Sequence, residues 1–357
     1  MPKLIALLSH IIGKGVIIGY NIGMAIIKVG VLRGGPSAEH EISLKTGANV
    51  LAILNDTLGH LYEARDIIVG KDGKWSFDEK VIAAHDALAK VDVVFNALHG
   101  TYGEDGKLQH LLETHSMPFT GSGSLGSALG MNKSLAKKIM MNQGIKVPYG
   151  REFSSEEISK NVREVADIIF KSFPLPVIIK PSASGSSAGI SIARNRLALA
   201  AALELASIHG EAVLVEDFIP GIEATCGVIE NFRGQELYAL PPVEIRPHSS
   251  SDFFDYGAKY EGKSDEIVPS TFSHEVKAII EDTAKRIHRA LGLNHYSRSD
   301  FIVHPRRGIY ALEVNTLPGL TNESLMPKSL RAVGSDTHEL VDHLIKLALR
   351  SHKKHII

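Results

Sequence analysis

Apolar residues along the chain fall into short runs separated by polar loops, a pattern typical of a protein that contains both strands and helices. IKVGVL (27–32) predicts a strand, and the Gly34-Gly35 turn after it leads into a helix expected from Ser37. Strand and helix patterns then alternate to about residue 125, through DVVFNALHG, KLQHLLETHSM and PFTGSG. This alternation predicts a parallel sheet with helices packed on it.

A second region begins near Met131 with the helix NKSLAKKIMMNQ, followed by the strands LPVIIKP, GISIA and AVLVEDFI. Farther on, apolar residues at 276, 280, 284, 287 and 291 recur at the spacing of one helix face. The polar stretch 247–265 predicts a long loop, and such loops often close over an active site.

The segment SRSDFIVHPRRGIYALEVNTLPG predicts a β-hairpin, because strand-forming residues flank a turn at Pro305–Gly308. If the turn has four residues, Asp300 lies opposite Glu313, and Arg298 opposite Asn315. These four polar side chains then share one face. The other face is expected to carry Phe301, Val303, Leu312 and Val314.

Two carboxylates at opposed strand positions, with Cβ atoms about 5 Å apart, repel each other unless a cation joins them. Oxygen ligands on rigid strands suit Mg²⁺, which usually also binds substrate phosphates. The alternative is a solvent-exposed strand face on which Arg298 pairs with Asp300 or Glu313.

Four further segments carry candidate chemistry. In IIKPSASGSSAGIS, Lys180 leaves a strand for a Gly/Ser loop that can bind an anion, although a flexible hairpin turn is the alternative. In GGPSAEHE, Ser37 is a candidate N-cap and Glu39 favours an ammonium ligand, unless Glu39 only caps the helix. His99 and Glu216 each end an apolar strand, where ligands gather in α/β sheets. Their alternatives are a structural core histidine and an exposed strand end.

Composition limits the class of protein. With 357 residues, two or three domains are expected, and a net charge of -1 gives no overall attraction to nucleic acid or anionic membranes. The single cysteine, Cys226, excludes an internal disulfide and fits a cytoplasmic location. Near the N-terminus Lys14 divides an apolar stretch, so neither half reaches the roughly 20 residues of a membrane-spanning helix. Residues 1–23 are therefore expected to be an extension before Met24 or a start assigned too early, and a membrane anchor is the alternative.

Six segments in this order resemble the D-alanine–D-alanine ligases of the ATP-grasp superfamily, over residues 27–350: GGPSAEHEISLKTG, ALHGTYGEDGKLQHLLE, PFTGSGSLGSALGMNKSLAKK, IIKPSASGSSAGIS, FFDYGAKY and EVNTLPGLTNESLMPK. The resemblance implies an ATP-grasp fold of α/β and α+β type with an N-terminal parallel-sheet domain. It also implies a cytoplasmic homodimer that acts on D-alanine with ATP and binds neither nucleic acid nor membrane. The expected divisions are 1–25 (extension), 26–126 (substrate-binding domain), 127–222 (central subdomain) and 223–357 (C-terminal subdomain).

The resemblance implies a role for each candidate residue. Those at the two D-alanine substrates are Glu39 with Ser186 and Tyr260 in one hydrogen-bonded group, His99 nearby, Arg298 and the Gly319 N–H at the oxyanion, and Ser324 at the second carboxylate. Those at the nucleotide are Lys133, Lys180 and Lys259 at the phosphates, Ser187 in the loop over them, Glu216 and Glu223 at adenine and ribose, and Ile219 against the base. Two Mg²⁺ (or Mn²⁺) ions are expected on Asp300, Glu313 and Asn315.

Two positions depart from the family pattern: Asn132 replaces the usual Asp, and Ser299 replaces a hydrophobic residue. Because Ser299 is expected to point away from the metal face, neither change weakens the expected activity. Ligases that form D-alanyl-D-lactate or D-alanyl-D-serine remain alternatives, as does an inactive nucleotide-binding protein. Tyr260 favours D-alanine as the second substrate, since ligases that prefer D-lactate carry a cationic residue in this segment.

Overall fold

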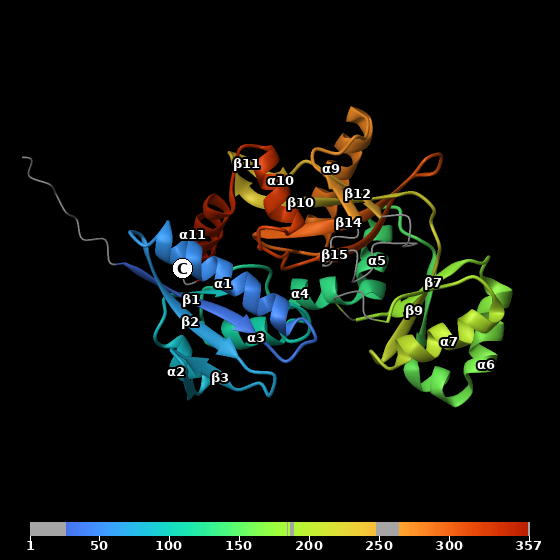
Figure 1. The fold of residues 1–357 in the computed structure, drawn as a ribbon, viewed down its shortest axis with the longest axis horizontal. Coiled ribbons are helices and arrows are strands. Elements are labelled where there is room, and N and C mark those ends of the chain that lie inside the picture. The colour runs from blue at the N-terminus through green and yellow to red at the C-terminus, as the bar shows by residue number, and fades with distance from the viewer. Residues whose placement is uncertain (1–25, 184, 186–188, 248–263, 356–357) are drawn as a thin grey trace, which may run out of the picture.

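The computed structural model describes residues 26–183, 185, 189–247 and 264–355, arranged as three sheets with their helices (Figure 1). The first sheet has the strand order β4-β3-β2-β1-β5. Its strands are β1 (Ile27–Gly34), β2 (Tyr62–Val69), β3 (Trp75–Phe77), β4 (Lys80–Ile82) and β5 (Val93–Asn96). β1 pairs in parallel with β2 and β5, which confirms the predicted parallel sheet. An antiparallel β3–β4 edge, not predicted from the sequence, extends it.

Helices α1 (His40–Asp56), α2 (Ala84–Leu88) and α3 (Lys107–Thr114) accompany this sheet. The prediction that α1 starts at Ser37 is wrong. The helix begins at His40, and the Ser37 hydroxyl instead donates to the His99 carbonyl (2.6 Å) and accepts from the Glu39 N–H (3.1 Å). Ser37 therefore joins two loops of the first sheet and does not cap the helix.

The central part of the chain forms a four-stranded antiparallel sheet in the order β6-β9-β7-β8. Its strands are β6 (Gly150–Ser154), β7 (Val177–Pro181), β8 (Ser191–Ala193) and β9 (Ala212–Asp217), and its helices are α6 (Ser155–Ser172) and α7 (Arg196–Ser207). Helices α4 (Ser124–Met131) and α5 (Lys133–Asn142) lead into it from the first sheet. Asn132 accepts from the Leu135 N–H (3.0 Å) as the N-cap of α5, a role that Asn and Asp fill equally well.

A six-stranded antiparallel sheet follows, in the order β13-β12-β10-β14-β15 with β11 on β10. Its strands are β10 (Ile222–Phe232), β11 (Gln235–Ala239), β12 (Val243–Pro247), β13 (Ser264–Ile267), β14 (Tyr296–His304) and β15 (Gly308–Asn315). Helix α9 (His274–Ala290) buries the apolar face predicted from its periodicity, and α10 (Leu325–Ala332) and α11 (Thr337–His355) end the fold.

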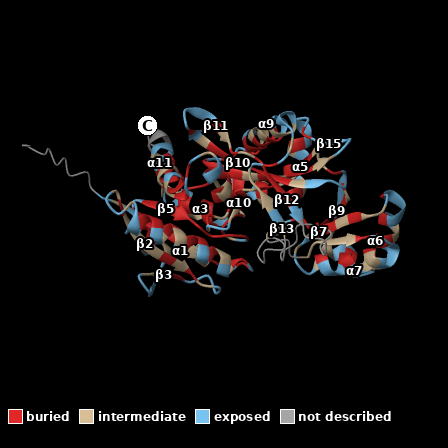
Figure 2. Cartoon of the chain, turned by 45° about the horizontal axis from the view of Figure 1, so that its top comes forward, coloured by how far each residue is buried: buried red, intermediate tan, exposed pale blue. Residues whose placement is uncertain are grey.

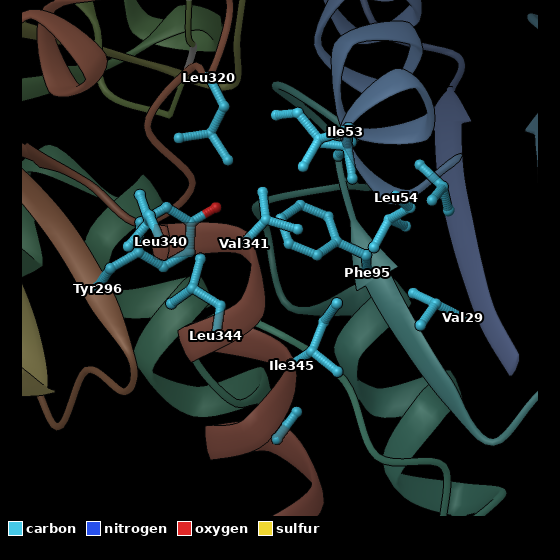
Figure 3. Packing of buried hydrophobic residues seen from close by; sticks show 14 of the residues in the cluster. Val29, Ile53, Leu54, Phe95, Tyr296, Leu320, Leu340, Val341, Leu344 and Ile345 are labelled. Carbon is cyan, nitrogen blue, oxygen red and sulfur yellow. The ribbon is translucent and has the colours of Figure 1, made fainter. Parts of the chain in front are cut away.

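One apolar cluster joins the two ends of the chain. Val29 and Phe95 of the first sheet pack with Leu344 and Ile345 of α11, and all four side chains are buried (Figure 3). Buried residues are dense where the first sheet meets α11 (Figure 2). The first and third sheets, together with α11, therefore share one core.

Candidate active site

The β14–β15 hairpin places four polar side chains together. In its ladder Asp300 pairs with Glu313, and Arg298 pairs with Asn315, as the sequence predicts. The neighbouring Ser299 is fully buried on the opposite face, whereas the Arg298 and Asp300 side chains are 15% and 20% exposed. The two carboxylates therefore do face the same side of the sheet.

The turn length from which this register was predicted is wrong. His304 pairs with Gly308, so the turn has three residues instead of four, and the ladder shifts by one between Asp300 and Phe301. That shift is a β-bulge, and it restores the Asp300–Glu313 pairing that an odd loop would otherwise prevent. As a result Ala311 takes the place opposite Phe301, and Leu312 packs against the Ile219, Ile302 and Tyr310 cluster. Leu312 was expected beside Phe301.

Each carboxylate of the hairpin has a cation beside it. Arg298 donates to both oxygens of Asp300, with Nε–Oδ1 and Nη2–Oδ2 distances of 3.0 and 3.1 Å. Thr225 on β10 donates to Asp300 Oδ1 (2.6 Å), and Lys133 Nζ lies 3.6 Å from Glu313 Oε2. The Arg298–Asp300 pair is the one the solvent-exposed alternative predicted. The partly buried setting and the adjacent lysine distinguish the face from an ordinary surface strand.

A second charged group lies at the N-terminal half of α5 and the ends of β7 and β9. Glu216 accepts hydrogen bonds from Lys137 and from Lys180, whose Nζ lies 2.9 Å from Glu216 Oε2. All three side chains are almost fully buried. Lys133 and Lys137 are one helical turn apart on α5, so a single helix reaches both Glu313 and Glu216. Lys137 was not among the residues predicted from the sequence, although its spacing from Lys133 was a usable signal.

The pKa values in this group follow from burial and mutual charge. Burial lowers the pKa of Lys137 to about 8, although Glu216 opposes that shift. Burial opposes the charged form of Lys180 too, but Glu216 and Glu313 outweigh it, and the pKa of Lys180 is raised. The pKa of Glu216 is lowered because its two lysines outweigh its burial. Glu216 is therefore ionised near neutral pH.

The loops of the first sheet contribute Glu39 and His99, both buried. Glu39 is the N-cap of α1 but makes no side-chain capping bond, so capping does not explain its carboxylate. A Cβ atom on Gly100 or Gly185 would lie 2.6 or 2.4 Å from Glu39 Oε2. Gly100 also has a positive φ of 74°, so this position favours glycine, and Gly185 lies directly against the Glu39 carboxylate.

His99 is held in a neutral form. Its Nε2 lies 2.9 Å from the Thr46 hydroxyl, and burial lowers its pKa to about 4, although a backbone hydrogen bond with Leu317 opposes the shift. The charge of Arg298 contributes further to the lowering. A neutral imidazole here can orient a substrate but cannot neutralise a carboxylate.

Glu104, which the sequence analysis did not single out, connects the first sheet to the hairpin. It accepts from the Gly100 N–H (2.8 Å) and from the Leu317 N–H (3.2 Å), and Leu317 N also donates to Asn315 Oδ1 (3.1 Å). Burial and the charge of Glu39 raise the pKa of Glu104 to about 8. No periodicity marks such a residue, since one of its partners is a backbone group of a loop far away in the sequence.

The loop after β15 holds the last two substrate candidates side by side. Ser324 Oγ accepts from the Thr321 N–H (3.2 Å), and a Cβ atom on Gly319 would lie 2.9 Å from Ser324 Oγ. Glycine at 319 therefore leaves room for the hydroxyl. At the nucleotide end, Ile219 belongs to a buried cluster with Ile302 and Tyr310, and Glu223 pairs with Ile302 across β10 and β14.

Four predicted site residues lie outside the described residues: Ser186, Ser187, Lys259 and Tyr260. Within the ranges that the structure describes, no three His, Cys, Asp or Glu side chains gather into a metal-binding group, and no helix is long and apolar enough to cross a membrane. The hairpin's oxygen donors are two carboxylates and one amide, which is a hard-ligand set that phosphate oxygens can complete.

Comparisons with known proteins agree on one family. Residues 139–346 match the family model described as D-ala D-ala ligase C-terminus, and residues 76–122 match D-ala D-ala ligase N-terminus. The D-alanine--D-alanine ligase of Syntrophobacter fumaroxidans is 40% identical over 90% of this chain and 98% of its own length, and that of Pelotomaculum thermopropionicum is 38% identical over 91% and 98%.

Solved structures show the same relationship. The VanG D-Ala:D-Ser ligase from Enterococcus faecalis has a TM-score of 0.77 at 31% identity and covers 90% of this chain and 99% of its own. The D-alanine--D-Alanine ligase from Bacillus anthracis complexed with ATP has a TM-score of 0.73 at 30% identity and covers 92% of this chain and 99% of its own.

Proposed function

This chain belongs to the D-alanine–D-alanine ligase family and is an ATP-dependent ligase, and from that premise we propose how its residues join two D-alanine molecules. One observation carries the proposal: interactions between ionisable side chains connect the first sheet to the hairpin and to the lysines. Glu39 and Arg298 both act on the buried Glu104, Arg298 pairs with Asp300, and Glu313, opposite Asp300, acts on Lys133 and Lys180. An ammonium site at one end and a phosphate site at the other suit the two reactants of the first step.

In the first step the carboxylate of one D-alanine attacks the γ-phosphorus of ATP, and ADP leaves. The buried Glu39 carboxylate holds the ammonium of that D-alanine and so orients its carboxylate toward the phosphates. Lys133, Lys180 and Lys259 neutralise the phosphates, with Ser187 in the loop above them. Ser186 and Tyr260 complete the hydrogen-bonded group around Glu39, and His99 positions it as a neutral ring.

In the second step the amine of another D-alanine attacks the carbonyl carbon of the acyl phosphate. The developing oxyanion accepts from Arg298 and the Gly319 N–H, the C–O bond to phosphate breaks, and phosphate leaves. Ser324 is assigned to the carboxylate of this second D-alanine, and the position of its hydroxyl beside Gly319 supports the assignment. No protein nucleophile is needed, since positioning and water exclusion supply the rate.

Glu216 and Glu223 are proposed to bind adenine and ribose, and Ile219 to pack against the base. The buried Ile219–Ile302–Tyr310 cluster beside the metal face supports this assignment. Two Mg²⁺ ions fit Asp300, Glu313 and Asn315, because these oxygens face one side of the hairpin. When bound, Mg²⁺ would neutralise charge on the ATP phosphates. The family resemblance also implies a homodimer, which light scattering of the purified protein would test.

The test of this function is phosphate release on mixing the protein with ATP, Mg²⁺ and D-alanine. We expect release that depends on all three components and that stops when D-alanine is replaced by L-alanine. ATP hydrolysis that is indifferent to D-alanine, or no release at all, would contradict the proposal.

D-serine is a second candidate for the acceptor, because the VanG ligase shares this fold. The two curated relatives above, at 40% and 38% identity, are D-alanine–D-alanine ligases, which favours D-alanine. Competition of D-alanine with equal D-serine or D-lactate between about pH 6 and 9 should yield mainly D-alanyl-D-alanine, because no cation is expected to oppose the ammonium. Chromatography of the products would identify the branch, and predominant depsipeptide near neutral pH would reject the assignment of Tyr260.

A further inference from the structure

Lys137 is a buried lysine to which the proposed chemistry gives no role. It lies on α5, one turn after Lys133, and its ammonium donates to Glu216. Glu216 also accepts from Lys180, and the exposed fractions of the Lys137, Lys180 and Glu216 side chains are 6%, 6% and 3%. One buried carboxylate thus serves two buried ammonium groups.

The charge of this group is unbalanced in favour of the cations. Two lysines and one glutamate give a surplus positive charge, and the nearby Glu313 carboxylate is already 3.6 Å from Lys133 Nζ. Buried charges are stable when each has a partner, so the surplus marks a place for an anion. The phosphates assigned to Lys180 are that anion in the proposed function.

Binding of phosphate to Lys180 creates a problem for Glu216. If Lys180 turned toward a phosphate and had been the only partner of Glu216, the carboxylate would be left buried and unpaired, which is costly. Conversely, if Lys180 were the only partner of Glu216, the carboxylate would hold Lys180 more firmly and would compete with the ATP phosphates for it. Lys137 removes both difficulties, because it stays on Glu216 while Lys180 moves.

We propose that Lys137 is a positioning residue that keeps the Glu216 carboxylate paired and in place, so that Lys180 can bind the ATP phosphates. This inference rests on the proposed function of the site and adds a residue to it. Lys137 acts through Glu216 and Lys180 and does not itself touch the reacting atoms.

The test compares Lys137→Met, which keeps the length of the side chain but removes its charge, with Lys137→Arg, which keeps the charge. Lys137→Met should raise the KM for ATP by roughly tenfold or more and leave the KM for D-alanine within about twofold. Lys137→Arg should recover most of the loss. Lys138→Met is the matched control, since Lys138 is the next residue on α5 and is exposed, and it should behave as the wild-type protein does.

A Lys137→Met protein with an unchanged KM for ATP, or with equal increases in both KM values, would overturn the inference. If that variant does not fold, Lys137→Met combined with Glu216→Gln removes both charges and avoids an unpaired carboxylate. The double variant should then bind ATP no more weakly than Glu216→Gln alone, and a further tenfold loss would also overturn the inference. Failure of the proposed function is distinct, because the wild-type protein would then release no phosphate with ATP and D-alanine.

Discussion

At the scale of single residues, the site is a set of charges that are already paired before any substrate arrives. Arg298 pairs with Asp300, Lys133 with Glu313, and Lys180 with Glu216. Such pairs hold the side chains in position, because within each of these three pairs a positive charge lies beside a negative one. In the proposed function, the ATP phosphates and Mg²⁺ would take over partners from these pairs, so little reorganisation would accompany the reaction.

Removing the charge of Glu313 should therefore impair chemistry far more than folding. We expect Glu313→Gln to lower kcat by about 100-fold or more, since a neutral amide is a much weaker ligand for a divalent cation. The melting temperature should change by only a few degrees, roughly what a loss of about 1 kcal/mol produces. Glu236→Gln in the same sheet, at an exposed position, should leave both quantities unchanged. Loss of folding with Glu313→Gln would mean that the carboxylate is structural.

Lys137 should give the ATP affinity a distinctive pH dependence. The charged groups facing it are Glu216 on β9, Lys180 on β7 and Glu313 on β15. Its pKa is lowered to about 8, mainly by burial, whereas the pKa of Lys180 is raised and that of Glu216 is lowered. Above about pH 8 the lysine loses its proton and Glu216 again depends on Lys180, so the KM for ATP should rise.

The measurement is the KM for ATP between about pH 6.5 and 9.5 at saturating D-alanine, for the wild-type protein and Lys137→Arg. Arginine stays charged throughout this range, so the rise should be absent or displaced to higher pH in the variant. An identical rise in both proteins would assign the titration to another group.

At the scale of elements, the length of the turn in the β14–β15 hairpin does not by itself decide which residues pair at the site. With a three-residue turn and no bulge, Asp300 would lie opposite Leu312. The bulge at Leu312 leaves that residue unpaired and brings Glu313 opposite Asp300. The pairing was predictable from alternation, but the bulge was not. The apolar character of Leu312 does not show which face of the sheet it occupies. Its position is set by contact with Ile219, Ile302 and Tyr310, two of them in the hairpin and one far away in sequence.

Changing the hairpin by one residue should therefore have opposite outcomes at its two irregular places. Insertion of one glycine between Arg306 and Arg307, at the exposed turn, should keep activity within about twofold, because the ladder above it is unchanged. Insertion of one alanine between Leu312 and Glu313 should abolish activity, because Glu313 then moves one position along the ladder and its side chain turns to the other face of the sheet.

Phosphate release with ATP and D-alanine, together with circular dichroism, checks both hairpin variants. Loss of activity with the glycine insertion, or an active protein with alanine inserted after Leu312, would show that the bulge does not set the register.

At the scale of the whole molecule, the first and third sheets are joined by polar contacts as well as by the shared core. The Tyr62 hydroxyl donates to Asp342 Oδ1 (2.7 Å), Asn49 Nδ2 donates to the Leu320 carbonyl (2.7 Å), and Glu104 accepts from Leu317 N (3.2 Å). The sequence predicted the elements on each side of this junction because those depend on local periodicity. It could not predict the contacts across the junction, which depend on packing between segments more than 200 residues apart. The expected divisions after residues 126 and 222 remain predictions.

The buried Glu104 should make the stability of this junction depend on pH. Its pKa is raised from about 4.5 to about 8, first by burial and then by Glu39, so the folded protein binds the proton more tightly than the unfolded chain does. Stability is therefore highest below the unfolded pKa and falls as the pH rises toward 8. We expect Glu104→Gln, which stays neutral, to lose less stability over this window, by roughly 3 °C in melting temperature.

Melting curves at intervals between about pH 5 and 8.5 would test this expectation, with Glu41→Gln as the control because Glu41 is an exposed carboxylate of α1. Parallel pH dependences in the wild-type protein and Glu104→Gln would show that Glu104 is ionised in the folded state.

The first residues of the chain should be dispensable. β1 begins at Ile27, and a chain that starts at Met24 keeps the whole strand between its partners β2 and β5. We expect such a chain to fold and to retain full ligase activity in the phosphate assay. Loss of solubility or activity would give residues 1–23 a structural role.

The apolar contact between the first sheet and α11 can form only after α11 has been synthesised. Val29 and Phe95 leave the ribosome long before Leu344 and Ile345 exist, so one wall of this core is missing while most of the chain is made (Figure 3). A nascent chain must keep that apolar face from aggregating until α11 has left the ribosome. A premature stop before Thr337 would thus damage the part of the protein that was made first.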